Sequence, residues 1–143
     1  MPSFKLGTDA DDHLIVEIHG RPDERDDWLD STISIRAGAF AGSFDAALMT
    51  CDFPPFRRQL ERLYEMLDST ATFDTIERQL RMKFTGNGRG GIVIHGVAGD
   101  RAADGNVLRF QFCIDQTFLP TIISDLQYIE AEFPSRVHPE FPQ

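Results

Sequence analysis

The chain has 143 residues, of which 41% are hydrophobic and 26% are charged, and both values fit one globular domain. Its 14 Lys and Arg against 23 Asp and Glu give a formal net charge of −9, which argues against nucleic acid and anionic membranes as partners. No apolar run approaches the ~18 residues of a membrane span, and residues 1–5 lack the basic and apolar parts of a secretory signal, so we expect a cytoplasmic protein.

Acidic residues are concentrated near the start of the chain. Residues 1–30 hold nine acids against three bases, and they include a long acidic segment from Asp23 to Asp30. Such runs usually face water as solubilising loops. Alternatively, they attract a basic protein partner, because complementary charge raises encounter rates and selects among partners. The sequence leaves both interpretations open.

Strand patterns occupy the first third of the chain. Residues 13–19 alternate between apolar and polar, and residues 4–6 are placed to pair with them as a hairpin. The polar segment 20–30 predicts a loop. Alternation resumes over residues 32–37 and again over residues 40–48, which predicts two more strands.

An amphipathic helix is predicted next. From Asp52 onward the spacing of apolar residues changes from two to 3.6, and this pattern continues to Leu67. We expect Asp52 to be the N-cap, because its carboxylate can accept hydrogen bonds from the free amides of the first turn. Pro54 and Pro55 fall in that turn, where no intrahelical donor is needed.

Three further strands are predicted after this helix. The stretch 77–84 alternates between apolar positions and the polar residues Glu77, Gln79, Arg81 and Lys83. Glycine-rich turns at 86–91 and 100–106 connect it to strands at 92–97 and 107–114. Short turns of this kind predict an antiparallel meander.

A second amphipathic helix is predicted from Thr117, its expected N-cap, to Phe133, where Pro134 ends it. We expect a single domain of residues 1–134, followed by a proline-containing C-terminal tail, 135–143. Strands that each bury one face and helices that each bury one stripe predict an α+β fold. The expected architecture is an antiparallel sheet of about six to eight strands with two amphipathic helices packed on one face.

No catalytic, metal or cofactor motif emerges from the sequence. His13 and His19 lie six residues apart on one predicted strand, or about 20 Å, which is too far to share a zinc ion. The glycine-rich turn at 86–91 matches neither the dinucleotide nor the phosphate-binding pattern. Cys51 and Cys113 are expected to be unpaired and half-buried. We therefore expect a non-enzymatic protein without a metal or cofactor.

The polar face of the predicted sheet is a candidate contact surface. It is expected to carry Glu77, Gln79, Arg81, Lys83 and Arg109. A flat, mixed surface suits a protein partner better than a small molecule, which needs a concave pocket. The alternative is that this face is simply solvated, as in many antiparallel sheets.

A series of short motifs runs through residues 14–134. In chain order they are Trp28-Leu29, Ile33-Ser34-Ile35, the small-residue strand 38–42, the helix 53–67, the strand 80–84, residues 91–96, Leu108-Arg109-Phe110, Asp115-Gln116-Thr117 and Phe133-Pro134. This order resembles the WapI-type immunity proteins of bacterial toxin systems. The resemblance implies a protein that neutralises a cognate toxin by direct binding, with no chemistry of its own.

The first functional hypothesis is therefore a non-catalytic immunity-type protein that binds a cognate toxin, which its acidity predicts to be basic. The candidate contact residues are Asp23, Glu24, Asp26, Asp27, Trp28, Glu77, Gln79, Arg81, Lys83 and Arg109. One alternative is a small-ligand or enzymatic domain with a cleft near His95 or His19. Another is a structural subunit that forms a homodimer through a sheet edge.

Overall fold

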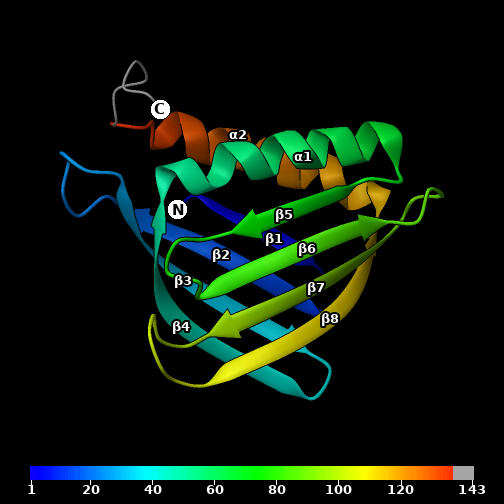
Figure 1. Ribbon diagram of the computed structural model, residues 1–143, viewed down its shortest axis with the longest axis horizontal. Helices are drawn as coiled ribbons and strands as arrows, with labels where there is room; N and C mark the ends of the chain where they lie inside the picture. The colour runs from blue at the N-terminus through cyan, green and yellow to red at the C-terminus, as the bar shows by residue number, and fades with distance from the viewer. Residues whose placement is uncertain (137–143) are drawn as a thin grey trace.

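The computed structural model describes residues 1–136 and consists of two four-stranded meanders, each followed by a helix (Figure 1). The first unit contains β1 (Ser3–Gly7), β2 (His13–Gly20), β3 (Trp28–Ala37), β4 (Phe40–Met49) and α1 (Phe53–Met66). The second contains β5 (Thr70–Asp74), β6 (Leu80–Gly86), β7 (Gly91–Gly99), β8 (Val107–Asp115) and α2 (Leu119–Glu132). In each unit a short 3-10 turn leads from the last strand into the helix, over Thr50–Asp52 and Gln116–Phe118.

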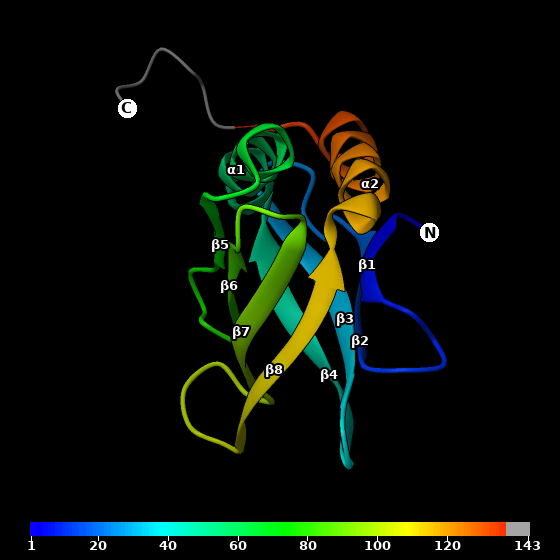
Figure 2. The same ribbon diagram turned by 90° about the vertical axis from the view of Figure 1, so that its right-hand side faces the viewer.

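The eight strands form two antiparallel sheets, β1-β2-β3-β4 and β5-β6-β7-β8. Figure 2 shows the sheets as two layers, with both helices lying side by side across one end. The predicted α+β class, antiparallel pairing and strand number are confirmed. The division into two sheets differs from the single layer that the sequence predicts.

The division into two sheets has a physical reason. A helix of 14 residues is about 21 Å long, whereas eight strands spaced about 4.8 Å apart would form a layer far wider than two helices can cover. The apolar faces of the two sheets therefore cover one another, and the helices close the open end. All the buried apolar side chains of residues 1–136 belong to one continuous core.

Phenylalanines join the two sheets and α1 at the centre of this core. Phe4 of β1 and Phe73 of β5 have ring centroids 5.8 Å apart, so they connect the two meanders directly. The Phe56 ring of α1 lies 5.0 Å from Phe73 and 5.4 Å from Phe84 of β6. All four side chains are fully buried, so the two meanders share one core.

The predicted limits of α1 are confirmed, but the capping is different. Asp52 lies at the N-cap position, yet its carboxylate accepts a hydrogen bond from the Met49 amide at 2.8 Å and none from α1. Asp115, and not Thr117, provides the side-chain cap before α2, by accepting from the Thr117 amide at 2.8 Å. The α-helix consequently starts at Leu119, after the 3-10 turn.

The end of the described chain lies against the loop between β2 and β3. The Arg136 amide donates to the Asp27 carboxylate at 2.6 Å, so the start of the predicted tail is tied to that loop. Residues 137–143 of the predicted tail lie outside the described residues. Within residues 1–136, no helix is both long and apolar enough to cross a membrane.

Candidate functional site

The outer face of the second sheet carries a group of cationic and apolar side chains around a shallow hollow of about 580 Å³. We call the outward residues of this hollow on β6, β7 and β8 the basic face. They are Arg81, Lys83, His95, Val97, Arg109 and Gln111. The face therefore combines positive charge with an apolar centre on a hydrogen-bonded sheet.

The strand register determines how these side chains lie. Lys83 is opposite His95, which is opposite Gln111, so these three form one row across the sheet. Arg81, Val97 and Arg109 form the neighbouring row. Because adjacent strands lie about 4.8 Å apart, the backbones of Arg81 and Arg109 are about 10 Å apart, with Val97 between them.

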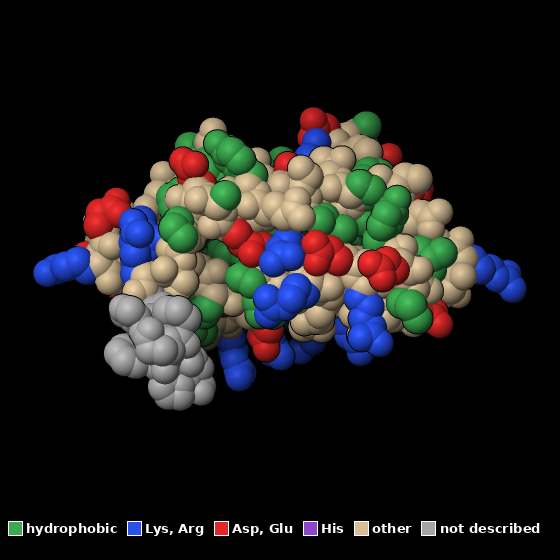
Figure 3. All heavy atoms as spheres, turned by 90° about the horizontal axis from the view of Figure 1, so that it is seen from above, with side chains coloured by type: hydrophobic (Ala, Val, Ile, Leu, Met, Phe, Trp, Pro, Cys, Tyr) green, Lys and Arg blue, Asp and Glu red, His purple; other side chains and the backbone are tan. Residues whose placement is uncertain are grey.

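The charge of the basic face is only partly neutralised. The Arg81 guanidinium pairs with Asp74 of β5 at 3.2 Å, and about half of each side chain is exposed. Lys83 and Arg109 have no ion pair or side-chain hydrogen bond among residues 1–136. Figure 3 shows Lys and Arg side chains projecting along its lower edge, the side on which the second sheet lies. This concentration is notable because the whole chain carries a net charge of −9.

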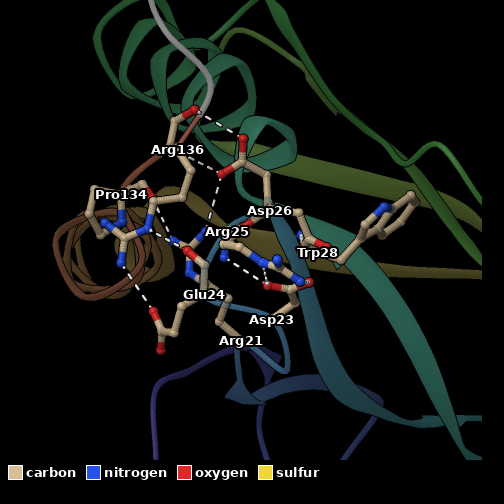
Figure 4. A network of polar contacts seen from close by, with 10 residues as sticks. Arg21, Asp23, Glu24, Arg25, Asp26, Trp28, Pro134 and Arg136 are labelled. Carbon is tan, nitrogen blue, oxygen red and sulfur yellow. Dashed lines mark hydrogen bonds and ion pairs between the residues drawn. The ribbon is translucent and has the colours of Figure 1, made fainter.

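The predicted acidic contact segment has a different environment (Figure 4). Asp27 is buried, and its carboxylate pairs with Arg21 at 3.2 Å, with only 3% of either side chain exposed. Arg21 also donates to the carbonyl oxygen of Pro134, and the Arg136 amide donates to Asp27. Asp27 therefore links the loop to the end of the described chain and is shielded from solvent.

Other carboxylates of this loop also bind within the chain. Asp23 pairs with Arg25 at 3.1 Å, and this hydrogen-bonded contact lowers the pKa of the Asp23 carboxyl. Glu24 pairs with Arg136 at 3.2 Å. The Asp26 carboxylate accepts from the Trp28 amide at 3.0 Å, and the Trp28 ring points away from the ion pairs in Figure 4.

The structure separates the predicted sheet residues into two groups. Arg81, Lys83 and Arg109 lie together on the basic face. Glu77 and Gln79 do not, because β6 begins at Leu80 and the preceding residues form a turn. Gln79 is 5% exposed, and its amide donates to the carbonyl oxygens of Asp45 and Gly99.

Sequence reasoning missed β5, which supplies Thr72 to the hollow and Asp74 to the ion pair with Arg81. The available signal was the short alternation over residues 70–74. Thr72 occupies an exposed edge position, where its amide donates to the Gln59 side chain of α1 at 2.9 Å.

Among the described residues, His19 and His95 do not share a cleft. These residues belong to different sheets, lie on opposite outer faces and line separate hollows. The His19 ring contacts the Thr32 hydroxyl at 2.6 Å, and that hydroxyl donates to Asp45 at 3.1 Å. The described residues contain no group of three potential metal ligands.

The expected half-burial of the cysteines is wrong. Cys51 and Cys113 are both exposed and unpaired. Cys113 alternates with the buried residues of β8 and so points outward, whereas Cys51 lies in the 3-10 turn before α1. The alternation of β8 places Cys113 beyond Gln111 on the same outer side of the sheet.

Comparison with known proteins gives one family match. The model of the immunity protein WapI-like family matches residues 5–134. A search of curated proteins finds no match. Among solved structures, the siderocalin Ex-FABP, described as functioning through dual ligand specificities, is 12% identical over 94% of this chain and 83% of its own, with a TM-score of 0.28. A TM-score this low does not establish a shared fold.

Proposed function

Because the chain belongs to the WapI-like immunity protein family, we propose that it binds and neutralises a cognate toxin by direct contact, without catalysis of its own. The proposed contact is the basic face. The observation that carries this proposal is the presence of Lys83 and Arg109, unpaired among the described residues, beside the partly exposed side chain of Val97. Arginine is enriched in protein interfaces, and a hydrogen-bonded sheet loses little conformational freedom on binding.

The competing contact, the acidic loop of residues 21–27, is less suitable. Its carboxylates accept hydrogen bonds or pair with Arg21, Arg25 and Arg136, so a partner would have to replace bonds that already exist. Breaking the buried Arg21–Asp27 pair would be especially costly. These contacts favour the sheet over the loop as the toxin-binding surface.

The test is a bulky substitution at the centre of the basic face. His95 lies on β7, is exposed and lines the hollow. We expect His95→Trp to weaken binding of the toxin domain encoded beside this gene at least tenfold in calorimetry, because the indole would hold the two surfaces apart. The matched control is Ser43→Trp on β4, an exposed position on the outer face of the other sheet.

Thermal melts of both variants would show whether the fold is preserved. Wild-type protein that fails to bind the toxin domain would contradict the proposed function. Binding that is weakened by Ser43→Trp and unaffected by His95→Trp would leave the function in place but assign the contact to the first sheet.

A further inference from the structure

We infer that the basic face binds an acidic segment of the toxin, whereas the composition of the chain predicts a basic one. This inference rests on the proposed function and adds the chemistry of the partner. The whole chain has a net negative charge, but the basic face carries positive charge that can pair with a partner. The inference comes from this contrast.

The available charge on the basic face is positive. Its six residues include three cations and no acid, and the nearby Asp74 pairs only with Arg81. By contrast, the loop of residues 21–27 has four acids, but Arg21, Arg25 and Arg136 pair with three of them. A partner that approaches the basic face therefore meets Lys83 and Arg109, two cations that have no ion pair among residues 1–136.

The spacing of the cations favours several carboxylates over one small anion. Arg81 and Lys83 are two residues apart on β6, which is about 7 Å, and Arg109 lies two strands away, about 10 Å from Arg81. Val97 and His95 lie between them. Lys83 and Arg109 can each pair with a carboxylate of the partner, while apolar groups of the same segment contact Val97.

A nucleic acid fits this surface less well than an acidic protein segment. A duplex carries one charge per ~1.7 Å and extends far beyond a face that three strands supply. Beyond the face it would meet the field of a chain with a net charge of −9. A short acidic segment can match the cationic groups without this repulsion.

The test reverses one charge on each outer face. Arg109→Glu removes a cation from the basic face, whereas Arg36→Glu makes the same change on the exposed outer side of β3. We expect Arg109→Glu to weaken binding of the toxin domain at least tenfold, because the new carboxylate would face an acidic partner. Arg36→Glu should change the affinity less than twofold, although both variants have the same net charge.

Salt provides a second measurement on the wild-type protein. Raising the ionic strength from 50 to 300 mM should weaken binding, and this dependence should be smaller for Arg109→Glu than for Arg36→Glu. Tighter binding by Arg109→Glu, or equal binding by both variants, would overturn the inference. If His95→Trp still blocked the toxin in that case, the proposed function and contact would stand.

An RNA oligonucleotide of 20 residues is the competing ligand. It should not displace the toxin domain from the wild-type protein at concentrations a hundredfold above that domain. Displacement that is abolished by Arg109→Glu would identify the face as a nucleic-acid site and overturn the inference.

Discussion

Gln79 lies where the two sheets meet, and its role is structural. Its side-chain amide donates to the carbonyl oxygen of Asp45 in the first sheet at 3.0 Å and to that of Gly99 in the second at 3.2 Å. The side chain is buried, so Gln79→Ala leaves both carbonyls without this donor. We expect a loss of about 1–3 kcal/mol in urea unfolding.

The control for Gln79 is Gln111→Ala, which removes an exposed amide from the basic face. It should change stability by less than about 0.5 kcal/mol. Equal effects of the two substitutions would show that the Gln79 hydrogen bonds do not hold the sheets together.

Asp52 is a buried carboxyl whose titration should be visible in stability. Burial raises its pKa from 3.8 to about 6, although the hydrogen bond from the Met49 amide acts in the opposite direction. Between these two pH values the folded protein binds a proton that the unfolded chain does not, so this carboxyl adds stability as the pH falls. That contribution is complete below 3.8 and is lost as the pH rises through about 6.

Asp52→Asn removes this titration and keeps an oxygen that can accept from Met49. The stability of the wild type relative to this variant should therefore increase between pH 7 and pH 4 in urea unfolding. A difference that stays constant over this range would contradict the raised pKa.

Asp27 and Gln79, which the sequence predicts at a contact surface, are both buried by contacts with distant partners. Asp27 looks like any other acid of its segment, because Pro134 and Arg136, which share its network, lie over 100 residues away. In the sequence, Gln79 fits the polar side of an alternating run. Its burial could not be foreseen, because the carbonyl oxygens that accept its hydrogen bonds belong to residues far away in the sequence. Local patterns indicate the period of an element but do not show such contacts.

Among the elements, the long amphipathic helix α1 and the short edge strand β1 were predicted, whereas the short edge strand β5 was not. The α1 helix has 14 residues with a continuous apolar stripe, so the helical spacing of apolar residues repeats over several turns. Strand β5 has only five residues, and its pairing with β6 depends on a turn that includes Arg78 at a positive φ of 60°. The number of sheets was also unpredictable, because alternation shows that one face is buried but not what covers it.

Close packing between β7 and β8 depends on Gly96. A Cβ on this residue would lie 2.1 Å from the Phe110 ring, which packs across it from the paired strand. Gly96→Ala must displace a buried ring, and we expect a loss of about 1–3 kcal/mol in urea unfolding. Gly42→Ala in β4 is the control, because a Cβ there meets nothing within 4 Å, and it should leave stability unchanged or slightly raised.

If Gly96→Ala were as stable as Gly42→Ala, the Phe110 ring would have room to move, and the close approach would not be a constraint. Gly96 lines the hollow, but a Cβ there would point toward the Phe110 ring and away from the outward side chains of the basic face, so toxin binding by Gly96→Ala should be retained wherever the variant is folded. Loss of binding by a folded variant would instead couple the core packing to the contact surface.

At the scale of the whole molecule, the chain repeats one layout of four strands, a 3-10 turn and a helix of 14 residues with proline in its first turn. The two units are nevertheless one folding body. Arg57 of α1 pairs with Glu130 of α2 at 2.6 Å, and Phe4 contacts Phe73 across the sheets. Neither unit can bury its apolar face without the other, so we expect the two units to fold and unfold together.

The buried Arg21–Asp27 pair connects this body to the end of its described chain. Asp27→Ala would leave the Arg21 guanidinium, 3% exposed, without its carboxylate, and would also remove the acceptor of the Arg136 amide. We expect this variant to lose about 3–5 kcal/mol in urea unfolding, because an unpaired buried charge is costly. Asp23→Ala, which removes a mostly exposed ion pair with Arg25, should lose far less stability than Asp27→Ala, because solvent screens an exposed pair.

The same pair of variants separates stability from binding. Because Asp23 lies on the loop and not on the basic face, Asp23→Ala should bind the toxin domain within twofold of the wild type. A large loss of binding by this stable variant would show that the loop contributes to the contact. Equal unfolding free energies for Asp27→Ala and Asp23→Ala would instead show that the Arg21 charge reaches water when its partner is removed, and that the loop is not anchored by this pair.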